Sequence, residues 1–200
     1  RLRVILARPD AVVLDLCCGT GDLALAFART GEARIVGADF AHAMLARARE
    51  KADLLAARRG RGSGQITLLE ADALRLPFGD ASFEAVASAF GFRNLANYEA
   101  GLREMLRVLK PGGTVAILEF AGPVPGLLGR FYQWYFRVVL PRVGRLLSGD
   151  RSAYEYLPAS ISRFFTPEGL AGAMRKAGFE QVRYELWFGG AALHLGQRPV

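Results

Sequence analysis

The sequence has little cysteine and no long uncharged apolar run. Its two cysteines, Cys17 and Cys18, are adjacent, so they can form neither a disulfide framework nor a CxxC metal site. No stretch of about eighteen apolar residues lacks a charge, which argues against a membrane-spanning helix. Charged residues and Pro9 interrupt the short apolar patch near the start, which argues against a signal peptide. We therefore expect a soluble, cytoplasmic protein without a metal site.

Length and composition predict one domain. Two hundred residues form a single core more often than two, so we expect one domain over residues 1–200. The hydrophobic fraction of 52% and the charged fraction of 22% argue against disorder and fibrous repeats. The net charge of +7 is uneven, with +2 over residues 1–122 and +5 over residues 123–200. This basic surplus permits nucleic acid, anionic lipid or an acidic substrate as partner.

Short apolar runs alternate with helix-forming segments as far as residue 120. The expected strands are Val12–Leu16, Arg34–Asp39, Ile66–Glu70, Phe83–Ala89 and Thr114–Phe120. The expected helices are Leu23–Arg29 with Asp22 as N-cap, Ala41–Arg59, and Tyr98–Leu109 stopped by Pro111-Gly112-Gly113. Alternation of this kind predicts a parallel α/β sheet with helices on both faces.

The pattern breaks after residue 120 and then resumes. Residues 123–150 contain three prolines and a dense aromatic segment. Pro167–Ala177 reads as a helix between the N-cap Thr166 and Gly178. Phe179–Trp187 and Ala191–Arg198 read as a terminal antiparallel hairpin. We therefore predict a doubly wound, mostly parallel sheet of seven strands with a helical insert at about residues 123–165.

A glycine-containing loop follows the first predicted strand. Gly19 and Gly21 allow close approach of a ligand to the backbone, and the next helix offers free N–H groups. With Ala24, the segment fits the relaxed dinucleotide pattern G-x-G-x-x-G/A. The alternative is a tight turn that binds nothing.

Acidic residues at three strand ends separate two kinds of ligand. Asp15, before the glycines, would repel a pyrophosphate but suits a ligand that carries a cation. Asp39 ends the second strand, where a carboxylate takes both ribose hydroxyls. Asp72 follows the third strand and could accept from an adenine amino group. Together these positions favour S-adenosylmethionine over NAD.

Several segments resemble a known family. The chain resembles class I methyltransferases and, more closely, the C-methyltransferases of ubiquinone and menaquinone biosynthesis. The matching segments are residues 13–22, 72–78, 107–113 with 118–120, and 192–194. Three further segments are more specific to that family: Phe90-Gly91-Phe92-Arg93-Asn94, residues 140–144, and Tyr154-Glu155-Tyr156-Leu157. The resemblance covers nearly the whole chain.

The resemblance implies a cofactor site and a reaction. It implies C-methylation of a polyprenylated quinol with S-adenosylmethionine as cofactor. For the cofactor it implies Thr20, Asp39, Asp72 and Ala73; where some members have a Ser that touches the cofactor, this chain has Ala89, with Ser88 one residue earlier. Together with the loop residues above, the predicted cofactor residues are Asp15, Gly19, Thr20, Gly21, Asp39, Phe40, Asp72, Ala73 and Ala89. Family members begin with a further segment that helps to cover the cofactor, and we expect that segment to be missing here because the sequence starts close to its first strand.

Methylation of a ring carbon also needs residues that orient the ring and polarise its hydroxyl. Arg93 is the first candidate, because it could polarise the hydroxyl or activate a water, and Asn94 could orient the ring. The alternative for Arg93 is a salt bridge that holds its loop. Tyr154 and Tyr156 are candidates for the substrate pocket, or pack in the core. His194 is expected to be structural, and no role is assigned to Glu119.

The aromatic, arginine-containing segment Gly126–Arg145 suits a lid over a lipid-tailed substrate near a membrane surface. The alternatives are a helical cap that completes the core and a homodimer contact; nucleic-acid binding is not expected, because the basic residues are interleaved with bulky aliphatic ones. Three other functions stay open: methylation of another small lipophilic molecule, an NAD-binding oxidoreductase, and a non-catalytic binding module.

Overall fold

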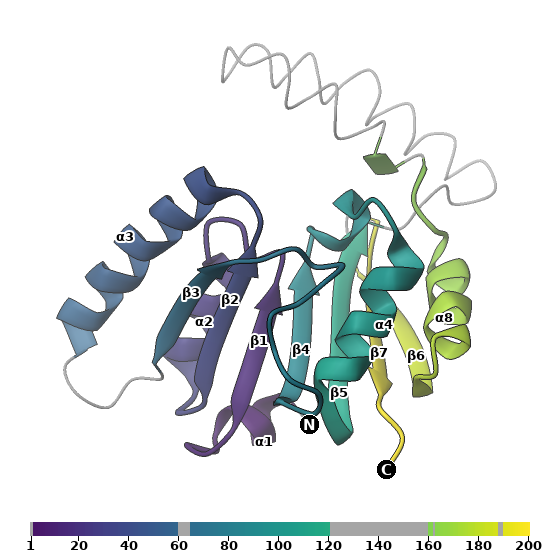
Figure 1. Cartoon of the computed structure of the whole chain (residues 1–200), viewed down its shortest axis with the longest axis horizontal. Coiled ribbons are helices and arrows are strands. Elements are labelled where there is room, and N and C mark those ends of the chain that lie inside the picture. Colours follow the sequence, from purple (N-terminus) through teal and green to yellow (C-terminus); the bar gives the residue numbers. More distant parts are fainter. Residues whose placement is uncertain (1, 60–64, 121–159, 162, 188–189) are drawn as a thin grey trace.

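The computed structural model describes residues 2–59, 65–120, 160–161, 163–187 and 190–200. They form one seven-stranded sheet in the order β3-β2-β1-β4-β5-β7-β6 (Figure 1). The strands are β1 (Val12–Leu16), β2 (Arg34–Asp39), β3 (Ile66–Glu70), β4 (Phe83–Ala89), β5 (Leu109–Phe120), β6 (Glu180–Trp187) and β7 (Ala191–Gln197). The predicted α/β fold with a mostly parallel seven-stranded sheet is confirmed.

The direction of the strands fixes where a ligand would bind. β1 pairs in parallel with β2 and β4, and β2–β3 and β4–β5 are also parallel. β7 runs antiparallel to both β5 and β6, which confirms the terminal hairpin. The strand order reverses between β1 and β4, so the crevice beyond the carboxyl ends of these two strands is the expected ligand position.

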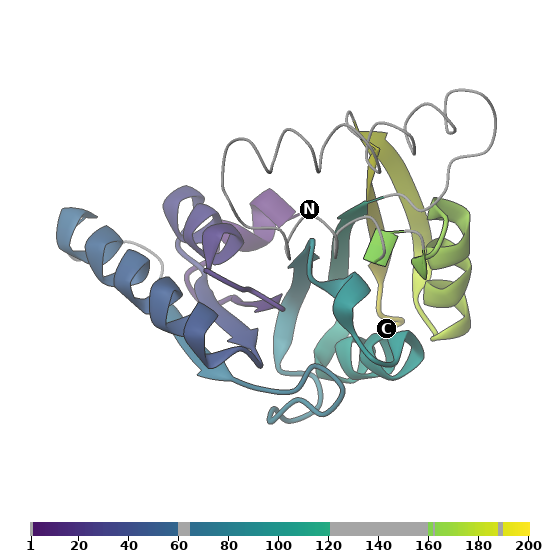
Figure 2. The same cartoon turned by 90° about the horizontal axis from the view of Figure 1, so that it is seen from above.

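Helices cover both faces of the sheet, as Figure 2 shows for α4 on one side and α1 and α2 on the other. The helices are α1 (Leu2–Leu6), α2 (Asp22–Thr30), α3 (His42–Arg59), η1 (Phe92–Asn94, a 3-10 turn), α4 (Tyr98–Val108) and α8 (Pro167–Lys176). Alternate residues of one strand serve the two faces: Leu14 and Leu16 pack toward α4 and α8, whereas Val13 packs toward α1 and α2.

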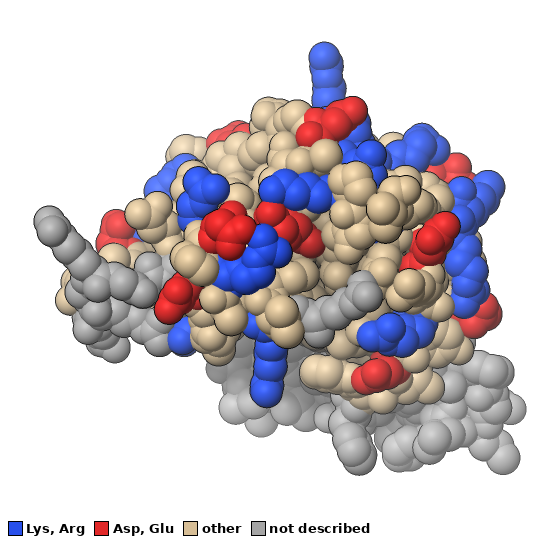
Figure 3. Space-filling view, turned by 90° about the horizontal axis from the view of Figure 1, so that it is seen from below, with Lys and Arg blue, Asp and Glu red and all other residues tan. Residues whose placement is uncertain are grey.

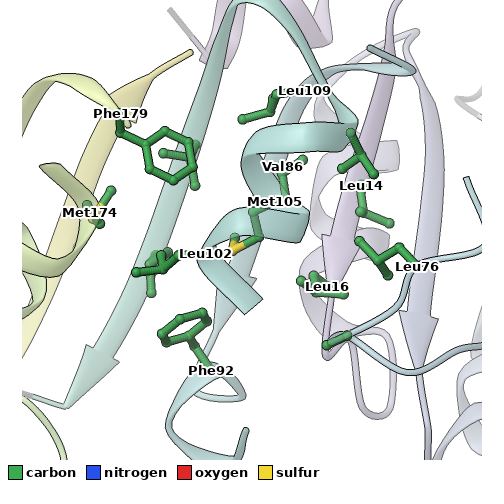
Figure 4. Packing of buried hydrophobic residues seen from close by; sticks show 14 of the residues in the cluster. Leu14, Leu16, Leu76, Val86, Phe92, Leu102, Met105, Leu109, Met174 and Phe179 are labelled. Atoms are coloured by element: carbon green, nitrogen blue, oxygen red, sulfur yellow. The ribbon is translucent and has the colours of Figure 1, made fainter. Parts of the chain in front are cut away.

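The larger core lies between the sheet and the helices α4 and α8 (Figure 4). Leu102 and Met105 of α4 and Met174 of α8 are fully buried there. Phe92, the first residue of η1, is also fully buried and anchors the 3-10 turn in this core. Residues 93 and 94 are therefore held next to a rigid part of the molecule.

Two local predictions need correction. Asp22 is the first residue of α2 and Gly21 is its N-cap. The Asp22 carboxylate contacts Thr20 and Lys51 instead of capping the helix, because Lys51 of α3 lies close to it.

The second correction concerns the turn at residues 110–113. α4 ends at Val108, and β5 begins at Leu109 rather than at Thr114. Leu109 already pairs with Phe83, and the backbones of Gly112 and Gly113 exchange hydrogen bonds with Arg198. A register irregularity between Phe83 and Ala85 accommodates the extra residues. The Pro-Gly-Gly segment thus lies within the strand and does not separate helix from strand.

Most of the insert predicted at 123–165 lies outside the described residues, as do Tyr154 and Tyr156. Within the described part of the chain, no helix is long and apolar enough to cross a membrane. On the face seen in Figure 3, basic and acidic side chains alternate and no single sign dominates. A nucleic-acid surface on that face would need a continuous basic patch.

Candidate functional site

The loop after β1 has the backbone of a ligand-binding turn. Cys17, Gly19 and Gly21 all have positive φ, at 57°, 53° and 79°. A Cβ at Gly19 would meet nothing within 4 Å, so the loop is open to a ligand at this position. A Cβ at Gly21 would lie 3.0 Å from the Cβ of Ala48, so the other side of the loop packs on α3. The predicted strand–loop–helix arrangement is present, with one open side.

Asp39 ends β2 next to this loop. Its Oδ2 accepts a hydrogen bond from the Gly19 N–H at 2.8 Å, and its Oδ1 accepts from the Ala41 N–H at 2.9 Å. Each carboxylate oxygen has a further lone pair for a ligand hydroxyl. Phe40, directly after Asp39, has 76% of its surface exposed. A large exposed aromatic beside a half-buried carboxylate is suited to a ligand with a ribose and a flat base.

Asp15 lies beneath the loop and does not reach the surface. It is 1% exposed, and its Oδ2 accepts a hydrogen bond from the Ala24 N–H of α2 at 2.9 Å. Burial raises the pKa of Asp15 to about 7, and the charges of Asp39 and Asp22 act in the same direction. A cation bound in the loop would favour the ionised carboxylate. The structure places Asp15 where it braces the loop from below.

Replacing Asp15 by asparagine is expected to increase stability at neutral and alkaline pH. Because the folded state raises the pKa, the stability from this group is complete below the unfolded value of about 3.9 and is lost as pH rises to about 7. Asparagine keeps an acceptor for the Ala24 N–H but leaves its own NH2 group unpaired, so the net gain above pH 7 is about 1 kcal/mol.

Urea unfolding between pH 4 and pH 9 measures this effect. The difference between Asp15→Asn and the parent should grow up to about pH 7 and then level off. A difference that is constant across this range would mean that Asp15 is already ionised at low pH in the folded state.

A contact across the loop could not be found from the sequence. Lys51 Nζ, from the middle of α3, donates to Thr20 Oγ1 at 3.0 Å and to Asp22 Oδ1 at 2.8 Å. Thr20 Oγ1 in turn donates to Asp22 Oδ2 at 2.9 Å. Lys51 is 31 and 29 residues from its two partners, so no local pattern signals the cluster. It ties the loop to α3, in addition to the hydrogen bond between Asp39 and Gly19.

The remaining predicted cofactor residues also lie at this edge of the sheet. Asp72 follows β3 and its Oδ1 accepts from the Leu74 N–H at 2.8 Å, with Ala73 buried beside it. Ala89 is the last residue of β4 and is half-buried. Ser88 is 2% exposed. Because neighbouring residues of a strand point to opposite faces, Ser88 cannot make the contact that Ala89 would make.

Arg93 forms a buried ion pair. One guanidinium nitrogen lies 3.0 Å from Glu119 Oε2 and also donates to the Phe90 carbonyl, and the Arg93 N–H donates to Glu119 Oε1 at 3.0 Å. The two side chains are 8% and 1% exposed. Burial raises the pKa of Glu119, although the guanidinium acts in the opposite direction. The salt bridge that the sequence left as an alternative is present, and exposed Asn94 stands next to it on η1.

The other singled-out side chains have structural surroundings. His194 is buried, with Nε2 2.8 Å from the Pro167 carbonyl oxygen, and burial lowers its pKa. Burial raises the pKa of the Cys17 thiol to about 12 and raises that of Cys18 further. Among the described residues, no cluster of His, Cys, Asp and Glu could hold a metal ion. His194 therefore has a structural partner, and burial disfavours the thiolate form of both cysteines.

The arrangement favours a particular class of ligand. Asp15 lies beneath the open loop, Asp39 lies beside it, and Asp72 follows β3 at the same edge of the sheet, while the open position at Gly19 leaves room for the ligand. A pyrophosphate would meet repulsion there, whereas a nucleoside with a cationic tail would find acceptors for its hydroxyls and a compensating charge. S-adenosylmethionine has these features, so the residues present fit it.

Comparisons with known proteins agree with this reading. A model of the "ubiE/COQ5 methyltransferase family" matches residues 2–198. A demethylmenaquinone methyltransferase of Thermus thermophilus is 53% identical over 94% of this chain and 82% of its own length. A ubiquinone/menaquinone biosynthesis C-methyltransferase UbiE of Idiomarina loihiensis is 42% identical over 93% of this chain and 73% of its own.

One solved structure gives the fold independently. Phosphoethanolamine N-methyltransferase 2 of Haemonchus contortus, in complex with S-adenosyl-L-methionine, has a TM-score of 0.70 with this chain. The match covers 95% of this chain and 49% of that one, at 15% identity. At this identity the likeness shows the fold alone.

Proposed function

Because the chain belongs to the ubiE/COQ5 methyltransferase family, we propose that it transfers a methyl group from S-adenosylmethionine to a ring carbon of a polyprenylated quinol. The observation that carries the proposal is the family match over residues 2–198. Among such quinols we propose demethylmenaquinol as the preferred substrate. The relative named demethylmenaquinone methyltransferase is 53% identical to this chain, whereas the relative named for both ubiquinone and menaquinone biosynthesis is 42% identical.

The cofactor would lie across the carboxyl ends of β1, β2 and β3. Asp39 would accept from both ribose hydroxyls, with Phe40 beside the base. Asp72 and Ala73 would border the adenine, because they follow the next strand of the sheet. Gly19, Thr20 and Gly21 would face the amino-acid end, and Ala89 would border the cofactor from the end of β4. Asp15 would act from beneath the loop through its charge.

The bound cofactor supplies an electrophilic methyl group on a sulfonium. The protein has to hold the quinol ring in line, exclude water and polarise a ring hydroxyl. Arg93 is proposed to polarise the ring hydroxyl, because its guanidinium is held by Glu119 beside β4. In addition, its Nε is buried without a partner among the described residues. Asn94 is proposed to orient the ring. The cofactor residues would hold the sulfonium so that its methyl group could pass to the ring carbon, with S-adenosylhomocysteine as the leaving product and release of the ring proton.

The substrate also suggests where the enzyme works. A polyprenyl tail partitions into lipid, so we propose that the protein meets its substrate at a membrane surface. The charge of +5 over residues 123–200 favours contact with anionic lipid. A cytoplasmic location, a homodimer, organisation as a single domain, and substrate contacts by Tyr154 and Tyr156 stay predictions.

Thermal unfolding with and without ligand tests the cofactor. S-adenosylhomocysteine at about 100 times its Kd should raise Tm by roughly 5–10 °C, whereas NAD at the same concentration should leave Tm unchanged. In a host that cannot methylate its quinone, expression of the gene should restore the methylated quinone in lipid extracts. A Tm shift with NAD alone, or extracts without the methylated quinone despite expressed and folded protein, would overturn the proposal.

A further inference from the structure

Phe90 has a backbone conformation that a bulky residue rarely adopts. Its φ is 58°, in the left-handed region, and it stands directly after β4. Both of its backbone polar groups are held: the N–H donates to the Leu118 carbonyl at 2.8 Å, and the carbonyl accepts from the Arg93 guanidinium. The surrounding contacts thus enforce this conformation at a position where glycine would fit without strain.

The same segment touches the cofactor loop. A Cβ at Gly91 would lie only 2.4 Å from the Cβ of Cys17, so the backbone after Phe90 packs directly on the loop that follows β1. Phe90 and the glycine loop therefore flank the point where the strand order reverses. An acceptor that receives a methyl group from a cofactor in that loop has to lie close to this point.

Phe90 is one half of an aromatic pair. Its ring centroid lies 4.8 Å from that of Phe120, the last residue of β5, with an angle of 43° between the planes. The Phe90 side chain is nevertheless 39% exposed. The guanidinium carbon of Arg93 lies 5.3 Å from the Phe120 ring centroid. Phe90 and Phe120 thus form a partly exposed aromatic pair, and the Arg93 guanidinium lies over the Phe120 ring.

We propose that Phe90 and Phe120 form the floor on which the acceptor ring stacks, with the Arg93 guanidinium over Phe120 at its border to stabilise a developing phenolate. This inference rests on the proposed function and names the part of the protein that selects an aromatic acceptor. The left-handed backbone at Phe90 directs an aromatic ring to this place, and Glu119 keeps the guanidinium from turning away. An electron-rich, hydroxylated aromatic ring gains from stacking and from a nearby cation.

Substitutions at Phe90 separate a substrate role from a packing role. Phe90→Leu removes the aromatic face, and Phe90→Gly removes the ring while relieving the left-handed backbone. Both should lower kcat/KM for short-chain demethylmenaquinol roughly tenfold, mainly through KM. The Kd of S-adenosylhomocysteine should stay within about twofold, and Tm of Phe90→Gly within about 2 °C of the parent.

The matched control is Phe78→Leu. Phe78 and Phe83 form another aromatic pair, with ring centroids 4.9 Å apart, so this change removes a comparable contact elsewhere in the fold. It should leave kcat/KM within about twofold. Equal kcat/KM for Phe90→Leu and Phe78→Leu, or a loss of activity that follows the loss in Tm, would contradict the proposal that the acceptor ring stacks on Phe90 and Phe120. Parent protein that binds S-adenosylhomocysteine but does not methylate the quinol would overturn the proposed function instead. In that case the stacking proposal is tested separately by the binding of 1,4-naphthoquinone. Equal Kd values for the parent and Phe90→Leu would contradict it.

Discussion

Replacing Glu119 by alanine is expected to lower the free energy of unfolding by about 3–5 kcal/mol. The change leaves the Arg93 guanidinium, 8% exposed, without its carboxylate partner. The Arg93 N–H also loses its acceptor, Glu119 Oε1. Denaturant unfolding at pH 7 measures the difference. The control is Glu99→Ala, which breaks exposed ion pairs with Lys176 and Arg103 and should cost much less stability than Glu119→Ala.

A double variant separates the structural and the chemical roles of Arg93. Glu119→Leu combined with Arg93→Met removes both charges, so most of the lost stability should return. Methyl transfer should not return, because the guanidinium that polarises the hydroxyl is gone. A stable double variant with parental kcat would assign Arg93 to structure alone. Failure of the double variant to recover stability would show that the two side chains do not interact as the geometry implies.

Replacing Asp39 by alanine is expected to weaken S-adenosylhomocysteine binding by about 100-fold or more. Two hydrogen bonds from ribose hydroxyls to a carboxylate are each worth about 1.5–3 kcal/mol, and tenfold in Kd is about 1.4 kcal/mol. The Gly19 N–H also loses its acceptor, Asp39 Oδ2, which weakens cofactor binding further. Titration calorimetry with S-adenosylhomocysteine measures Kd directly.

Two further variants sharpen that result. Asp39→Asn keeps an acceptor for the Gly19 N–H but removes the charge, so its Kd should lie between those of the parent and Asp39→Ala. Glu70→Gln removes a charge at the end of the neighbouring strand, where the carboxylate is exposed and pairs with His42, and should change Kd less than about threefold. Equal effects of Asp39→Asn and Glu70→Gln would point to general charge and not to ribose recognition.

The sequence predicts the sheet well because its strands are marked locally. Val12–Leu16 is a short run between turn residues that is apolar except for Asp15, and the structure has β1 over the same residues. The Pro111-Gly112-Gly113 segment was misread because the partner of its backbone, Arg198, lies at the far end of the chain. Propensity marks a turn there, whereas the neighbouring strands supply the hydrogen bonds of a strand.

The candidate site, like the fold, could be predicted from the sequence only in part. Asp39 and Asp72 could be placed from sequence because each directly follows a predicted strand, and parallel strands bring their carboxyl ends to one edge. The partners of Arg93 and Thr20 could not, because Glu119 and Lys51 come from elements 26 and 31 residues away. The positive φ of Phe90 has no sequence signal either, since phenylalanine does not favour that region.

The most direct test of the central claim is the position of the transferred methyl group. The protein is incubated with reduced demethylmenaquinol and S-adenosylmethionine carrying a 13C-labelled methyl, and the product is examined by NMR and mass spectrometry. We predict one labelled methyl on a ring carbon, with both hydroxyls free. Label on a hydroxyl oxygen, or no labelled product from protein that binds S-adenosylhomocysteine, would contradict the assignment as a quinol C-methyltransferase.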